Sequence, residues 1–200
     1  MEIFDANPLI LEETVRGIQP IQIEDELLRR REIFLTSEVN AETASALFKQ
    51  LLYLERQDPG APVTLYISSP GGQVDSGMAV YDLIRLMRSP VRTVCIGLAA
   101  SMGSILFLAG DTRAMLPDTR LMIHDPSFGG GNMTGKKPLQ LQKELEGLMQ
   151  IREVLTAVIA ERTGLSVEQV REMTAEDTYL TARRSLELGL ATEIITRGES

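Results

Sequence analysis

The sequence of 200 residues has no tryptophan, one cysteine, one histidine and only 4% aromatic residues. A single cysteine excludes an intrachain disulfide. Because Cys95 lies within an apolar run, we expect it to be a buried, reduced thiol, as is usual in cytoplasmic proteins. One histidine and one cysteine cannot supply the usual nitrogen and sulfur ligands of a zinc site. We therefore expect no metal.

Long apolar runs and an excess of positive charge are also missing. No stretch approaches the roughly 18 apolar residues of a membrane span, and the N-terminus lacks the basic segment of a signal peptide. The net charge of −8 argues against a nucleic-acid partner, because phosphate contacts need a basic face. We expect a globular cytoplasmic protein, since 44% hydrophobic and 24% charged residues are typical of soluble domains.

From residue 32 onward, the sequence alternates between predicted strands and helices. Apolar runs and alternating patterns predict strands at 32–36, 63–68, 91–97, 112–116, 120–124, 179–181 and 191–196. Helical spacing and capping residues predict helices after Asn40 and over 73–89, 138–162, 166–173 and 182–190. Such repeated strand–helix–strand units predict an α/β fold with parallel strands and right-handed crossovers. We expect one domain over 31–200, preceded by an extended arm over 1–30.

Ser101 lies in the stretch "GLAASMGS", where a predicted strand leads into a helix. A serine at that position usually caps the helix, because its oxygen accepts a hydrogen bond from a free amide. The small neighbours Gly97, Ala99 and Gly103, however, leave room for another backbone, and a helix N-terminus favours a developing oxyanion. The competing interpretation is therefore a nucleophile. Ala99 stands at the first glycine of G-x-S-x-G, so the motif is not that of α/β-hydrolases.

Gly71 and Gly72 form a second turn, in "SPGG", after the preceding strand. Taken alone, the pair indicates a tight turn that needs positive φ. Two such turns on adjacent parallel strands would nevertheless face each other at the carboxyl edge of the sheet, where α/β sites form. A backbone amide without a side chain nearby could there point at a carbonyl oxygen.

The single histidine, His124, ends the predicted strand "RLMIH". A lone histidine is more often structural than catalytic, but it is the side-chain type best suited to general base catalysis near neutral pH. The neighbouring Asp125 should point to the opposite face, so it should not orient the imidazole. Asp177 cannot be singled out among 28 acidic residues from the pattern alone.

The stretch "GGNMTGKK", over 130–137, matches part of a phosphate-binding loop. Lys137 stands where serine or threonine should bind magnesium, and "DPSFG" separates the glycines from the preceding strand. We therefore expect no nucleotide and no other cofactor.

Five motifs together resemble the proteolytic subunit of the Clp protease family: "LYISSPGG", "GMAVYDLIR", "CIGLAASMGS", "LPDTRLMIHDP" and "YLTARRSLELGLA". The resemblance covers nearly the whole chain, in the family's order. It implies a crotonase-like spiral of repeated ββα units with a protruding handle helix, the handle spanning about 127–163. It also implies self-association into two stacked heptameric rings, a tetradecamer around a closed chamber. A separate ring-shaped ATP-dependent unfoldase would feed unfolded polypeptides into that chamber.

The resemblance also implies roles for individual residues. It assigns Ser101 as the nucleophile, His124 as the general base and Asp177 as the carboxylate that orients the histidine. The backbone amides of Gly72 and Met102 would form the oxyanion hole. The implied activity is that of a serine endopeptidase, and the glycines over 129–131 would lie in the peptide-binding region.

Some positions depart from the family's pattern. Glu176 stands where the family usually has an arginine that joins ring-to-ring ion pairs. Ala114 stands where many members carry an aromatic residue in the cleft that binds the unfoldase. Asp125 stands where glutamine is common. The departures fit a divergent paralogue that pairs with another subunit or that binds a different unfoldase. Residues 1–30 would provide an axial loop, with any short propeptide cut within the first dozen residues.

Two other functions stay open at this point. One is a structural ring subunit that is inactive alone, for which the altered interface positions argue. The other is a crotonase-type acyl-CoA enzyme, which would share the spiral and the glycine turns. Such enzymes usually work with carboxylates, so Ser101 argues against the second alternative.

Overall fold

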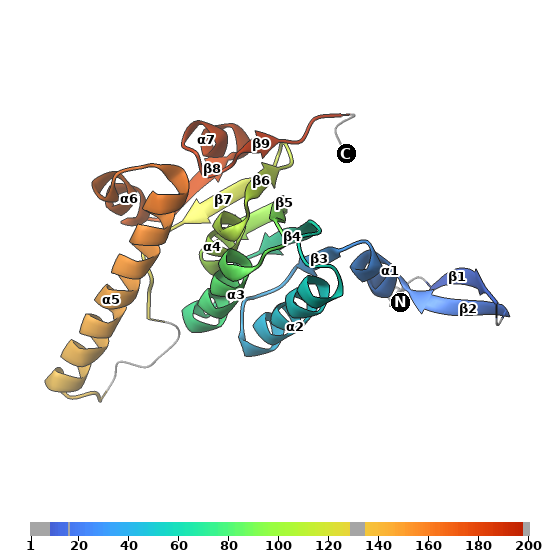
Figure 1. Cartoon of the computed structure of the whole chain (residues 1–200). Helices are drawn as coiled ribbons and strands as arrows, with labels where there is room; N and C mark the ends of the chain where they lie inside the picture. The colour runs from blue at the N-terminus through green and yellow to red at the C-terminus, as the bar shows by residue number, and fades with distance from the viewer. Residues whose placement is uncertain (1–8, 16, 129–134, 198–200) are drawn as a thin grey trace, which may run out of the picture.

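A seven-stranded, mostly parallel sheet forms the centre of the computed structural model, which describes residues 9–15, 17–128 and 135–197 (Figure 1). Five strands follow one another across it in the order β3 (Glu32–Leu35), β4 (Val63–Ser69), β5 (Val91–Ala100), β6 (Thr112–Met115) and β9 (Glu193–Ile194). The other two are β7 (Arg120–Ile123), which pairs with β5, and β8 (Thr178–Thr181), which pairs with β7.

The sheet branches at β5, its longest strand. One edge of β5 pairs with β4, while the other pairs first with β6, over Arg92–Cys95, and then with β7, over Leu98–Ala100. All pairs in the sheet are parallel except β7–β8, which is antiparallel. The mostly parallel α/β fold confirms the prediction from the strand–helix alternation, and it is consistent with the Clp protease fold.

The helices begin and end close to their predicted limits. Asn40 caps α2 (Ala41–Gln57) by accepting hydrogen bonds from the amides of Glu42 and Thr43, and Ser166 caps α6 (Val167–Thr174). The other helices are α1 (Ile23–Arg29), α3 (Val74–Leu86), α4 (Met102–Ala109), α5 (Pro138–Thr163) and α7 (Ala182–Glu187). Helix α5 extends away from the sheet at its N-terminal end, as expected for a handle (Figure 1). Among the described residues, no helix is long and apolar enough to cross a membrane.

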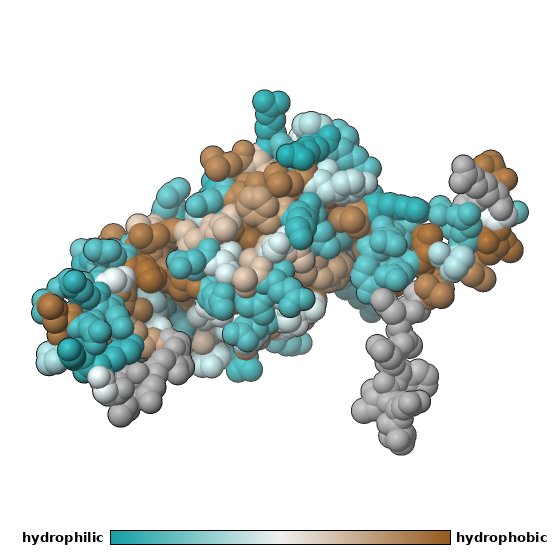
Figure 2. Space-filling model, turned by 90° about the horizontal axis from the view of Figure 1, so that it is seen from below, coloured by the Kyte–Doolittle hydropathy of each residue, from teal (hydrophilic) through white to brown (hydrophobic). Residues whose placement is uncertain are grey.

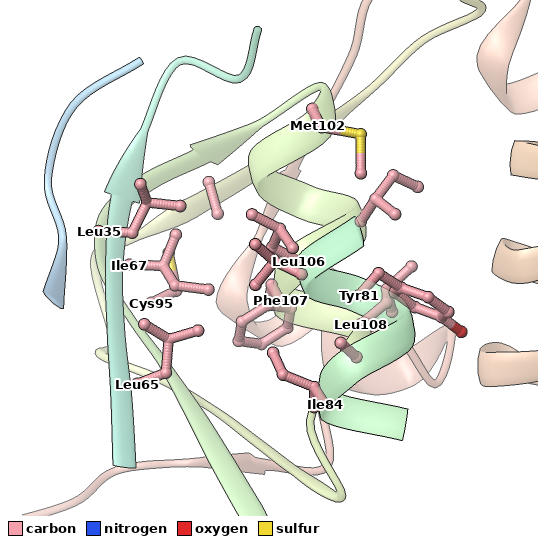
Figure 3. Packing of buried hydrophobic residues seen from close by; sticks show 14 of the residues in the cluster. Leu35, Leu65, Ile67, Tyr81, Ile84, Cys95, Met102, Leu106, Phe107 and Leu108 are labelled. Carbon is pink, nitrogen blue, oxygen red and sulfur yellow. The ribbon is translucent and has the colours of Figure 1, made fainter. Parts of the chain in front are cut away.

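Helix α4 lies in the middle of the core, and all of its residues are buried. Figure 3 shows Leu106 and Phe107 of α4 facing side chains of the sheet, with α3 beyond them. Cys95 is one of those sheet residues: it is a buried free thiol, as predicted, and burial raises its pKa. A helix that is apolar on every side is stable only when surrounded by protein, so α4 has little freedom to move.

Three arginines hold the C-terminal end of α4. Arg113 is only 7% exposed, and its guanidinium donates to four backbone carbonyls, one of them Gly110 O. Arg162 donates to Leu108 O and Gly110 O, and Arg85 donates to Ala109 O. Burial, Arg162 and Arg85 together lower the pKa of Arg113. The last carbonyls of a helix carry partial negative charge, which explains why cations gather here.

The N-terminal segment differs from the extended arm that we expected. Strand β1 (Leu9–Thr14) pairs antiparallel with β2 (Gly17–Gln22), and α1 follows directly. Three acidic residues in the first turn of α1 and an ion pair between Glu26 and Arg30 favour this helix. The hairpin exposes Leu9, Leu11 and Ile18. Figure 2 shows brown, hydrophobic residues among hydrophilic ones at the hairpin end of the molecule. The part of the expected propeptide before residue 9, and the glycines over 129–131, lie outside the described residues.

We predict that Arg113→Met lowers the free energy of unfolding by about 3 kcal/mol or more. Removing one partner of a buried hydrogen bond costs about 1–3 kcal/mol, and several carbonyls lose their donor here. Urea unfolding followed by circular dichroism measures the change. Arg92→Met is the matched control, because Arg92 and Glu193 form a half-exposed ion pair on the same sheet, worth at most about 1 kcal/mol. Equal losses in the two variants would contradict the role given to Arg113.

Candidate active site

Ser101 follows the last residue of β5 and precedes the first residue of α4. Its φ of 52° and ψ of −124° are unusual for a residue with a side chain and indicate local strain. The amide of Ser101 donates to Met122 O of β7, which fixes the turn. Although Ser101 stands at the N-cap position, its side chain makes no capping hydrogen bond. The Oγ atom lies instead 2.8 Å from His124 Nε2.

His124 and Asp177 are brought together by the antiparallel pair β7–β8. His124 directly follows β7 and Asp177 directly precedes β8, and the register pairs Ile123 with Thr178. His124 Nδ1 lies 3.1 Å from Asp177 Oδ1. The three side chains therefore form a line from serine to imidazole to carboxylate. This long-range pairing selects Asp177 from the other carboxylates, which the sequence pattern could not do.

Asp125 points away from the imidazole of the preceding residue, as expected for neighbours at the end of a strand. Its Oδ1 accepts a hydrogen bond of 2.7 Å from Thr174 Oγ1, and its Oδ2 lies 2.7 Å from Arg152 Nε. Among the described residues, the carboxylate beside the second nitrogen of His124 is therefore that of Asp177 and not that of Asp125.

The Gly71–Gly72 turn lies against the Ser101 turn. A Cβ on Gly71 would be 2.6 Å from both Ala100 O and Ser101 Cβ, and φ is +95° at Gly71 and +145° at Gly72. Glycine is needed here both for its backbone conformation and for the close approach. The two glycine-bearing turns meet at the carboxyl ends of β4 and β5, as their spacing predicts.

Two backbone amides are free beside Ser101. Gly71 O accepts a hydrogen bond from the amide of Val39, and a trans peptide points its C=O and N–H in opposite directions. The Gly72 amide therefore points away from Val39. Met102 is the first residue of α4, so its amide has no partner within the helix. Within the ranges that the structure describes, neither amide donates to a protein acceptor.

A small, mostly apolar hollow opens next to the Ser101 side chain. Helices α3, α4 and α5 and strand β7 line it with Val74, Ile105, Ile123, Leu155 and Ile159. A second, polar hollow lies on the other side of His124, and its rim includes Glu176 and Asp177. The arrangement thus places a serine hydroxyl, an imidazole and two amides without an acceptor among the described residues between an apolar and a polar recess.

The remaining positions singled out in the sequence lie apart from this site. Ala114 is fully buried on β6. Also apart from the site, Tyr66 of β4 stacks on Phe34 of β3, with the ring centroids 4.9 Å apart. In the candidate phosphate loop, Lys136 forms an ion pair with Glu144, while 130–134 lie outside the described residues. Among the described residues, no group of three or more histidine, cysteine or acidic side chains could hold a metal ion.

A comparison with protein families gives a match that extends over nearly the whole chain. The family model of Clp protease matches residues 15–198, which contain the three aligned side chains and both free amides. The match agrees with the motifs noted in the sequence and with the mostly parallel α/β architecture. The chain belongs to the Clp protease family, as a proteolytic subunit with the role of a peptidase.

Proposed function

We propose that this chain is a serine endopeptidase, with Ser101 as the nucleophile, His124 as the general base and Asp177 as the orienting carboxylate. The observation that carries the proposal is the continuous line of short contacts, 2.8 Å from Ser101 Oγ to His124 Nε2 and 3.1 Å from His124 Nδ1 to Asp177 Oδ1. Serine, histidine and carboxylate at such distances are the arrangement that activates a hydroxyl for attack on an acyl group.

In the first step, Ser101 Oγ attacks the carbonyl carbon of the scissile peptide while His124 Nε2 accepts the hydroxyl proton. Asp177 accepts a hydrogen bond from Nδ1–H, which orients the ring and stabilises the imidazolium. The carbonyl oxygen of the substrate becomes an oxyanion. The amides of Gly72 and Met102, which have no acceptor among the described residues, would donate to it, aided by the N-terminal end of α4.

In the second step, the C–N bond breaks and His124 returns the proton to the leaving amine. The acyl group remains on Ser101 as an ester. Water then attacks the ester carbon, His124 takes a proton from the water, and the proton passes to Ser101 Oγ as the ester bond breaks. The enzyme returns to its starting state with one peptide bond hydrolysed.

We further propose that the subunit assembles into two stacked heptameric rings, which meet through α5. In the cytoplasm, the rings would receive unfolded polypeptides from an ATP-dependent unfoldase. Exposed apolar side chains on α5 support an interface there, namely Leu139, Leu145, Met149 and Val154. Phe34 stacks on Tyr66, and 40% of Phe34 is exposed. The two rings would offer an apolar surface to an unfoldase. A closed chamber would confine an unselective peptidase to substrates that the unfoldase delivers.

A subunit that is inactive until it assembles is the second candidate. The side chain of Asp177 is 62% exposed in the isolated chain, and it lines the same hollow as Glu176, so both are accessible to a neighbouring subunit. A crotonase-type acyl-CoA enzyme fits the site less well, because the strained turn holds a serine against a histidine where those enzymes use carboxylates.

We predict that a fluorophosphonate labels Ser101 of the purified protein and that His124→Ala lowers the labelling rate to near background. Within the described part of the chain, His124 is the base that contacts Ser101 Oγ. Mass spectrometry of digested protein identifies the labelled residue. Ser104→Ala serves as the control, because Ser104 lies one turn along α4 and donates only to Ser101 O. Sedimentation in the same buffer distinguishes an unassembled subunit from an assembled one that does not react. Assembled rings without labelling, together with tight acyl-CoA binding, would contradict the proposal.

We also predict that Gly71→Ala lowers kcat for a peptide substrate by about 10²–10³, the cost of losing one oxyanion donor. The added methyl would contact Ala100 O and the Ser101 side chain and would shift the Gly72 amide. Gly60→Ala is the matched control: Gly60 also has a positive φ, of +93°, but a Cβ there meets nothing within 4 Å. If both variants lose activity equally, backbone strain alone explains the effect.

A further inference from the structure

Asp177 is the most exposed side chain of the proposed triad. It is 62% exposed, against 24% for His124. Burial therefore does not hold this carboxylate in place, and an exposed ion pair contributes little by itself. The mechanism nevertheless needs the carboxylate to remain within hydrogen-bond distance of His124 Nδ1. The backbone segments on either side of the two residues must set that distance.

On one side, the β7–β8 ladder sets the distance between His124 and Asp177. Ile123, directly before His124, pairs with Thr178, directly after Asp177. The ladder alone would leave His124 and Asp177 free to move about the ends of their strands. A second connection is needed on the far side of His124 and Asp177 to fix their separation.

Asp125 and Thr174 provide that second connection. The amide of Asp125 donates to Thr174 O at 2.7 Å, and Thr174 Oγ1 donates back to Asp125 Oδ1, also at 2.7 Å. Thr174 is the last residue of α6 and is only 3% exposed, so its side chain is fixed by packing. The backbone segments that carry His124 and Asp177 are thus connected on both sides of these two residues, by the Ile123–Thr178 pair and by the hydrogen bonds between Asp125 and Thr174.

Helix α5 also contacts the carboxylate of Asp125. Arg152 Nε lies 2.7 Å from Asp125 Oδ2, with the two side chains 23% and 30% exposed. The Nε–H does not point at the oxygen closely enough for a hydrogen bond, so the contact is one of charge. The arginine offsets the negative charge that Asp125 would otherwise add beside the imidazole.

We infer that Asp125 and Thr174 are positioning residues for the proposed peptidase: their paired hydrogen bonds fix the distance between His124 and Asp177. The inference rests on the proposed function. The competing explanation is a purely structural tie between β7 and α6, which would affect stability without affecting the imidazole.

The test uses the isosteric change Thr174→Val, which removes the hydroxyl while filling the same space, and the conservative change Thr174→Ser, which keeps the hydroxyl. The chain holds one histidine, so 15N-histidine NMR of the full chain reports on the His124 ring alone. The rate of fluorophosphonate labelling at Ser101 gives the second readout.

In Thr174→Val we expect the Nδ1 signal of His124 to move and the labelling rate to fall by about tenfold or more, because small displacements of a catalytic group cost this much. Thr174→Ser should restore most of both. Asp125→Ala should cause a similar loss, and adding Thr174→Val to it should cause no further one, because both changes break the same hydrogen bond.

Arg171→Gln is the matched control. Arg171 Nη2 lies 2.6 Å from Glu153 Oε2 and also joins α6 to α5, but the pair does not contact Asp125 or His124. It should leave the imidazole signal and the labelling rate unchanged.

A lower melting temperature in Thr174→Val with an unmoved His124 signal would overturn the inference, and so would independent, additive losses in the double variant. If the wild type does not label but the His124 signal still responds to Thr174→Val, the proposed function fails while the positioning role stands.

Discussion

The pairing of β5 with two neighbours on one edge is the constraint on which the rest of the site depends. Because β5 pairs first with β6 and then with β7, its last residues lie between β4 and β7. The ends of these strands carry the glycine turn, Ser101 and His124. Three segments that are far apart in the chain are therefore held together by main-chain hydrogen bonds, and their side chains need only complete the arrangement.

The two ends of α4 show how backbone charge is used in different ways. At its C-terminal end, carbonyls without helical partners bind three arginines, so the polar groups there are satisfied within the protein. At its N-terminal end, the Met102 amide has no acceptor in the part of the chain that the structure describes. An unsatisfied amide costs free energy when buried, but beside a nucleophile it is available to a reacting carbonyl oxygen. The helix is thus anchored at one end and left open at the other.

Local signals in the sequence predict most of the elements but not all of the site. Asn40 and Ser166 act as the caps that their positions predict, because capping depends on residues a few positions apart. Ser101 and the two glycines were identified as candidates from the turns in which they lie. Asp177 could not be, because its place beside His124 depends on the pairing of β7 with β8 across more than fifty residues. The sequence does not predict the hairpin β1–β2, because it lacks the Asn-Gly or Asp-Gly pair typical of a two-residue turn and has no clear period there.

The positive φ of Ser101 has a consequence for how such a chain can change over time. A residue with a side chain in that conformation costs about 1–3 kcal/mol, and glycine would relieve the strain. Thermodynamic preference and chemistry therefore oppose each other at this position. A copy of the gene released from selection for hydrolysis would gain stability by exchanging its serine for glycine, while the sheet and the rings it is proposed to build would lose nothing. A serine in so costly a conformation is what the proposed function requires at this position.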